Sequence, residues 1–97
     1  MKLLREIIYG VSILEIKGNT NIAIEKLTFD SRYVQNLSLF VAVVGSQSDG
    51  HDFILNAENA GVSAIVCESF PEKLKEDVTY IKVPDSSSAL GLIASNF

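Results

Sequence analysis

The sequence is poor in cysteine, in histidine and in positively charged residues. Among its 97 residues there are one cysteine, one histidine and eight lysines and arginines, against twelve aspartates and glutamates. A single cysteine excludes an intrachain disulfide and a zinc site built from several cysteines, and it suits a reducing compartment. Nucleic acid is not an expected partner, because nonspecific binding to it depends on clustered lysine and arginine. One small anionic ligand at a local site remains compatible with the net charge of −4.

Long apolar runs are also missing. No stretch approaches the roughly 20 apolar residues of a membrane span. The amino-terminal run is interrupted by Arg5 and Glu6, unlike the apolar core of a signal segment. We therefore expect a cytoplasmic protein with no membrane partner. The length suits a single domain, residues 1–97, and a hydrophobic fraction of 47% is that of a chain that folds.

The common motifs of nucleotide-binding and metal-dependent enzymes do not occur. There is no Gly-x-x-x-x-Gly-Lys-Ser/Thr loop, no Gly-x-Gly-x-x-Gly and no His-Glu-x-x-His. His51 has no second histidine or cysteine to share a metal with, so we expect it to form hydrogen bonds at a helix start. Cys67 is expected to be an inert buried thiol. The sequence therefore predicts no catalytic residue, no metal site and no cofactor held by these 97 residues.

The hydrophobic pattern alternates between strands and helices. Strands are expected at 22–29, 39–44, 63–68 and 79–83, with a weaker one at 12–18, and helices at 2–9, 53–60 and from 86 onward. The second helix is expected to bury a stripe made of Phe53, Ile54, Ala57 and Ala60. Gly10 and Gly61 suit helix ends, and Asp85 or Ser86 suits an N-cap. This order predicts an α/β fold, with a small mostly parallel or mixed sheet flanked by helices and at least one right-handed crossover.

Two polar segments follow expected strands directly. One is "DSR" (30–32), and the other is "GSQSDGHD" (45–52), which leads into the second expected helix. Ligands of parallel sheets bind beyond the carboxyl ends of the strands, and a loop that enters a helix carries free backbone N–H groups. From chemistry alone, a Gly/Ser/Asp loop before a helix is more often a solvated connection than a ligand site, and "DSR" is most often a polar turn. Their position makes them the candidate ligand-binding segments of this chain.

The side chains of these segments suit a polar ligand. Gly45 and Gly50 allow close approach of a ligand to the backbone. Asp49 would repel a phosphate, so it is expected to cap the helix or to accept a hydrogen bond from a ligand N–H. Arg32 is the nearest cation for a diphosphate, which a guanidinium can bind through two hydrogen bonds. The segments therefore predict a small polar site rather than a catalytic one.

Four segments together resemble a known family. "LTFDSRYV", "LFVAVVGSQSDGHDFI", "AENAGVSAIVCE" and "VPDSSSALGLIASNF" occur in the order and spacing of the N-terminal domain of the Mur ligases, the MurE type in particular, over residues 26–97. The resemblance implies a cytoplasmic, ATP- and Mg²⁺-dependent ligase of peptidoglycan synthesis with a MurE/MurF-like N-terminal domain. Such a ligase joins meso-diaminopimelate or L-lysine to UDP-N-acetylmuramoyl-L-alanyl-D-glutamate. The central ATPase domain and the C-terminal domain of such a ligase are absent from these residues, so we expect the isolated chain to be inactive.

The resemblance also implies a set of substrate-binding residues. Those expected to contact the UDP end of the substrate are Phe29, Ser31, Ser46, Gln47 and Ser48. Additional candidates beside them are Arg32, Asp49, Gly50 and His51. Two alternatives stay open: the D-alanyl-D-alanine-adding ligase of the MurF type, which shares both motifs, and a stand-alone, non-catalytic α/β interaction module whose polar loops are only connections.

Overall fold

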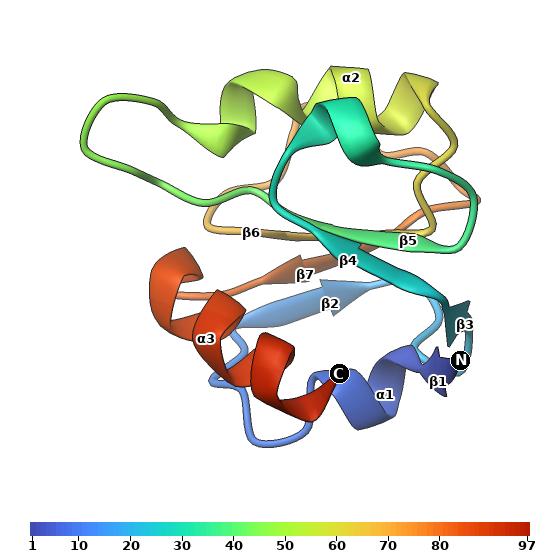
Figure 1. Ribbon diagram of the computed structural model, residues 1–97. Coiled ribbons are helices and arrows are strands. Elements are labelled where there is room, and N and C mark those ends of the chain that lie inside the picture. Colours follow the sequence, from blue (N-terminus) through green and yellow to red (C-terminus); the bar gives the residue numbers. More distant parts are fainter.

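The centre of the protein is a mixed sheet of five strands in the order β2–β7–β6–β5–β4 (Figure 1). The computed structural model describes all residues 1–97. The strands are β2 (Glu15–Lys17), β4 (Lys26–Thr28), β5 (Ser38–Val41), β6 (Ala64–Cys67) and β7 (Thr79–Lys82). The four strands β4 to β7 are parallel, and β2 pairs antiparallel with β7. The predicted α/β fold with a small mixed sheet is confirmed.

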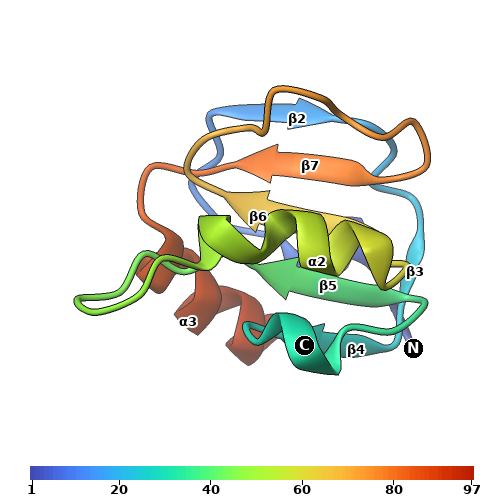
Figure 2. The same ribbon diagram turned by 90° about the horizontal axis from the view of Figure 1, so that it is seen from above.

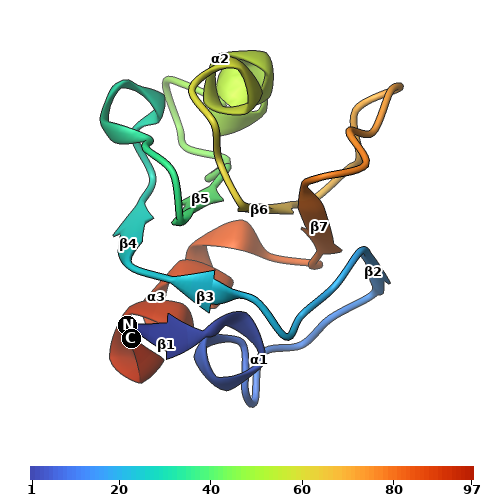
Figure 3. The same cartoon turned by 90° about the vertical axis from the view of Figure 1, so that its right-hand side faces the viewer.

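Helices cover both faces of this sheet, because its central strands carry apolar side chains on both sides. In β5, Leu39 and Val41 join the core beneath α1 (Leu4–Ile7) and α3 (Ser86–Asn96). Phe40 lies in a second core with α2 (Ile54–Asn59). Figure 3 shows the resulting three layers, with α2 on one side of the sheet and α1 and α3 on the other. A strand buried on both faces explains why 39–44 reads as a continuous apolar run.

The predicted helix ends agree with the structure. Gly10 and Gly61 have φ values of +80° and +89°, the left-handed region that glycine adopts most easily. Asp85 is the N-cap of α3, and its carboxylate accepts a hydrogen bond from the Ser88 N–H at 3.1 Å. The chain between β6 and β7 forms no helix or strand. None of the three α-helices is long and apolar enough to cross a membrane.

Two predicted elements differ from the structure. Residues 22–29 form two short strands, because the chain changes partners at Glu25: β3 (Ala23–Ile24) pairs with β1 (Lys2–Leu3), and β4 joins the main sheet. The predicted helix at 2–9 is accordingly shorter, since its first residues form β1. Propensity alone does not reveal a change of strand partner.

The second predicted helix begins as a 3₁₀-helix, η2 (Gly50–Phe53), and continues as the six-residue α2. Ile54 and Ala57 are buried as expected, but Phe53 is 44% exposed and Ala60 is exposed. The tighter turn of the 3₁₀-helix places Phe53 off the buried stripe of α2. The predicted membership of Phe53 and Ala60 in that stripe was therefore wrong.

Candidate functional site

The segments that follow β4 and β5 meet at one edge of the sheet and enclose a pocket of about 650 Å³. Figure 2 shows the loop after β5 extending beyond the carboxyl ends of the strands. We call residues 45–50 the β5 loop. The pocket is lined by Phe29, Asp30, Ser31, Arg32, Val43, Gly45, Ser46, Gln47, Ser48, Gly50 and Phe53. The parallel arrangement brings the two polar segments together as the strand order predicts.

The segment after β4 is held by its own hydrogen bonds. Thr28 Oγ1 accepts a hydrogen bond from the Asp30 N–H at 3.0 Å, and the Asp30 carboxylate accepts one from the Arg32 N–H at 3.0 Å. Asp30 thereby caps the 3₁₀-helix η1 (Ser31–Tyr33). The Ser31 hydroxyl has no hydrogen-bond partner in the chain, so it is free to bind a ligand in the pocket.

Arg32 is paired with a carboxylate instead of standing free. Its Nη2 lies 2.7 Å from Asp30 Oδ2, and its Nε lies 3.0 Å from Asp30 Oδ1. The hydrogen bonds from the Arg32 side chain and backbone lower the pKa of Asp30 to about 2, and the same pair raises the pKa of Arg32. Arg32, which the sequence predicted to bind phosphate, thus has its charge balanced by Asp30, although 79% of its side chain is exposed.

We expect Arg32→Ala to raise the pKa of Asp30 from about 2 toward 3.8, its ordinary value, because the side-chain hydrogen bonds are lost. Carboxyl ¹³C shifts followed against pH measure this change. Asp85, whose pKa is lowered by Ser88 at a separate helix start, is the internal control. Because the pKa of Asp30 is lower in the folded state than in the unfolded state, its ionised carboxylate stabilises the fold at pH values above 3.8. This stabilisation is lost as the pH falls toward 2. An unchanged Asp30 titration in the variant would contradict the ion pair.

The β5 loop is a closed turn whose tip is free of internal hydrogen bonds. The Gly45 N–H donates to the Ser48 carbonyl at 2.9 Å, and the Gly50 N–H donates to the Val43 carbonyl at 2.8 Å. Between these bonds, residues 46–48 are exposed, and neither their backbone N–H groups nor their side chains bond within the chain. Three consecutive N–H groups, two hydroxyls and one amide therefore face the solvent beside the pocket.

Gly50 allows the β5 loop to return against its own strand. A Cβ atom at this position would lie 2.7 Å from the Val43 nitrogen and 2.9 Å from the Cα and carbonyl carbon of Ala42. These are backbone atoms, which have little freedom to move away. The glycine is therefore required by close packing against its own strand, a reason different from the close ligand approach that the sequence predicted, and it also lines the pocket.

Asp49 and His51 support the loop and do not line the pocket. The Asp49 carboxylate accepts hydrogen bonds from the backbone N–H of His51 at 2.9 Å and from its Nδ1 at 2.6 Å, which lowers the pKa of Asp49. His51 Nε2 accepts the Glu68 N–H at 2.8 Å, so the ring proton resides on Nδ1. The predictions of a capping Asp49 and a hydrogen-bonding His51 are confirmed. The N–H groups at the start of η2 are already bonded, that of Gly50 to the Val43 carbonyl and those of His51 and Asp52 to Asp49, so none of them is left for a phosphate.

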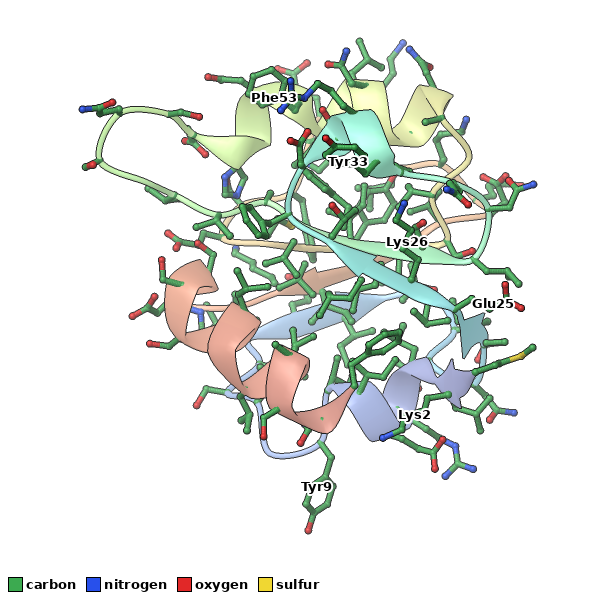
Figure 4. The ribbon with its side chains drawn as sticks, viewed as in Figure 1. Lys2, Tyr9, Glu25, Lys26, Tyr33 and Phe53 are labelled. Atoms are coloured by element: carbon green, nitrogen blue, oxygen red, sulfur yellow. The ribbon has the colours of Figure 1, made fainter.

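The structure brings together most of the predicted site and adds residues to it. Seven of the nine candidates line the pocket: Phe29, Ser31, Arg32, Ser46, Gln47, Ser48 and Gly50. Sequence reasoning missed the placement of Phe53, which is 44% exposed and forms a second aromatic wall beside the 64% exposed Phe29. In Figure 4, Phe53 lies on the same side of the molecule as Tyr33 of η1. No three histidine, cysteine, aspartate or glutamate side chains converge as a metal site.

Known proteins resemble this chain in both sequence and fold. Residues 23–97 match the model of the Mur ligase family, catalytic domain. The chain is 45% identical over 95 residues to a UDP-N-acetylmuramoyl-L-alanyl-D-glutamate–2,6-diaminopimelate ligase of Cytophaga hutchinsonii, covering 97% of this chain and 20% of that protein. It is 44% identical over 94 residues to the ligase of the same name from Bacteroides fragilis, covering 97% and 19%. The chain thus spans about a fifth of the length of these relatives.

Solved structures with this fold are also ligases of the family. A MurF ligase from Thermotoga maritima, solved with ADP, matches with a TM-score of 0.62 and 31% identity over 72% of this chain and 16% of that one. The UDP-N-acetylmuramoylalanyl-D-glutamyl-2,6-diaminopimelate–D-alanyl-D-alanyl ligase from Acinetobacter baumannii has a TM-score of 0.66 at 23% identity over 75% of this chain and 16% of that one, which shows the shared fold. Since the family model matches more than half of the residues, the chain belongs to the Mur ligase family.

Proposed function

We propose that the chain is the N-terminal domain of a MurE-type ligase and that its pocket anchors the UDP end of UDP-N-acetylmuramoyl-L-alanyl-D-glutamate. The full-length enzyme would use ATP to add a diamino acid to that substrate in the cytoplasm. The names of the relatives favour 2,6-diaminopimelate over lysine. The observation that carries the proposal is that Phe29, Ser31 and residues 46–48, separated in sequence, line one pocket.

The chemistry of the pocket suits uridine better than a bare phosphate. Uracil offers one N–H donor and two carbonyl acceptors, which hydroxyl, amide and backbone groups can pair with. Phe29 and Phe53 supply exposed aromatic faces on which a base can stack. Arg32, the sole cation of the pocket, is already paired with Asp30, so the diphosphate would rely mainly on the free N–H groups of residues 46–48. The domain contributes binding and positioning rather than chemistry.

The proposal places ATP and Mg²⁺ outside these 97 residues. The chain has neither a lysine-containing phosphate loop nor a converging group of acidic or histidine side chains, so the residues present do not fit a magnesium–nucleotide site. The central and C-terminal domains of the full-length enzyme are the partners that would supply it.

A MurF-type ligase is the second candidate, because the structural matches include MurF enzymes. The relatives at 40–45% identity carry the name of the diaminopimelate-adding ligase, which is why the MurE type is preferred. Comparing UDP-N-acetylmuramoyl-dipeptide with the tripeptide as substrate of the full-length enzyme separates the two types.

Titration of the ¹⁵N-labelled chain with UDP tests the proposal, with CMP as the control ligand. We expect amide shifts confined to Ser31 and the β5 loop. Ser31→Ala and Gln47→Ala should each weaken UDP binding about three- to tenfold, which corresponds to one lost hydrogen bond. Stability should change by less than about 0.5 kcal/mol, because both side chains lie at the surface of a pocket.

Gln35→Ala is the matched control for Gln47→Ala, since Gln35 is also exposed and its side chain has no bonded partner. It should leave the UDP affinity unchanged. Absence of shifts at millimolar UDP in this chain and in the full-length protein would support the interaction-module alternative and refute the anchoring role.

A further inference from the structure

We propose that Glu68, which does not line the pocket, is a positioning residue that fixes both ends of the β5 loop. The effect of Glu68 on substrate binding rests on the proposed function. Glu68 directly follows β6 and is partly buried. Its backbone and its carboxylate each take part in a separate chain of hydrogen bonds, and the two chains end on opposite stems of the loop.

The first chain holds the stem that leaves the loop. The Glu68 N–H donates to His51 Nε2 at 2.8 Å, and His51 Nδ1 lies 2.6 Å from Asp49 Oδ1. The His51 side chain is only 15% exposed, so the ring is fixed between the two partners. Asp49 is consequently tied to the end of β6 through His51, although Glu68 follows His51 by 17 residues in the sequence.

The second chain holds the stem that enters the loop. Glu68 Oε2 accepts hydrogen bonds from the Ser86 N–H and from the Ser86 hydroxyl, both at 2.8 Å. Because that hydroxyl gives its single proton to Glu68, its lone pairs are turned to the Val44 N–H, which donates to it at 2.9 Å. Ser86 is completely buried at the first residue of α3, and Figure 2 shows this helix beginning beside the base of the loop.

The two chains explain how a loop with a free tip can have a fixed shape. The backbone N–H groups and side chains of residues 46–48 have no partner in the chain, and only the Ser48 carbonyl is bonded, so the position of the tip depends on the stems at Val44 and Asp49. A site whose groups are held in place before binding loses less entropy when the ligand arrives. Without the carboxylate, the buried N–H and hydroxyl of Ser86 lose their acceptor, and Val44 loses an oriented partner. Glu68 therefore acts on the ligand through the loop and not by contact.

Amide hydrogen exchange and UDP titration of the 97-residue chain test this inference. Alanine keeps the backbone N–H that bonds His51 and removes only the carboxylate chain. We therefore expect Glu68→Ala to speed exchange at the Val44 amide about fivefold or more and to weaken UDP binding by a similar factor. Glu68→Gln should remain within about twofold of the wild type, because its carbonyl oxygen can accept the same two hydrogen bonds. Glu72→Ala removes an exposed carboxylate without bonded partners from the same connection and should change neither quantity.

Unchanged exchange and affinity in Glu68→Ala would overturn the inference, as would a Glu68→Gln variant as impaired as the alanine variant. If Glu68→Ala does not fold, Ser86→Ala decides: it removes the Val44 anchor alone and should speed exchange at Val44 and weaken UDP binding. An unchanged Val44 exchange rate and an unchanged UDP affinity in Ser86→Ala would also overturn the inference. Failure of the wild type to bind UDP would contradict the proposed function, while the exchange rates, measured without ligand, still decide the role of Glu68.

Discussion

Replacing Gly50 with alanine is expected to lower the free energy of unfolding by roughly 1–3 kcal/mol, the usual cost of overpacking. The added Cβ would lie within 3 Å of three backbone atoms of Ala42 and Val43, at the end of a fully buried strand. Relief requires the β5 loop to move away from the strand, which would also break the Gly50–Val43 hydrogen bond. We therefore expect UDP affinity to fall together with stability.

Urea unfolding measures the stability change, and a shifted midpoint with an unchanged slope identifies it as such. Gly91→Ala is the matched control, because a Cβ at Gly91 meets nothing within 4 Å on the exposed side of α3. That substitution should stabilise the protein by roughly 0.5–1 kcal/mol, the difference between alanine and glycine inside a helix. Equal stability of the Gly50 and Gly91 variants would show that the loop does not depend on a close approach at Gly50.

The sheet could be predicted from the sequence where packing and local pattern agree. The run from Leu39 to Val41 is apolar on both faces, and β5 is buried on both. The region 22–29 has the same strand-forming residues, yet it divides at Glu25 between two sheets. Which neighbour a strand pairs with is decided by tertiary contacts over long sequence distances, and the composition of the strand itself does not carry that information.

The site shows the same division between local and long-range information. Asp49 as a cap follows from local rules and is present, whereas the packing of Gly50 against Ala42 and Val43 depends on how the loop returns to its strand. Arg32 was expected to offer an unpaired charge, but it forms an ion pair with the neighbouring Asp30. This pairing depends on how the chain turns at η1. The bonds from Glu68 to His51 and Ser86 span 17 and 18 residues, so no short motif records them. Local rules therefore identify the loops, and only the fold reveals what holds them.

Phe29→Ala should weaken UDP binding about tenfold or more, because an aromatic side chain stacked on a base contributes about 1–3 kcal/mol. Phe29 is 64% exposed and lines the pocket beside Phe53, so its ring is accessible to a base. Phe29→Leu keeps the apolar wall and loses the stacking surface, so it should fall between the wild type and the alanine variant. Isothermal titration with UDP, and with pyrophosphate as a ligand without a base, measures these differences.

Tyr9→Ala is the matched control for the loss of an exposed aromatic ring. Tyr9 is 79% exposed and projects from the side of the molecule opposite Phe53 (Figure 4). Both variants should keep the wild-type stability to within about 0.5 kcal/mol, and only Phe29→Ala should lose affinity. If pyrophosphate binding falls as much as UDP binding, the ring shapes the loop instead of holding the base. If neither falls, Phe29 is not part of the site, and Phe53→Ala then tests whether the second aromatic wall alone carries the base.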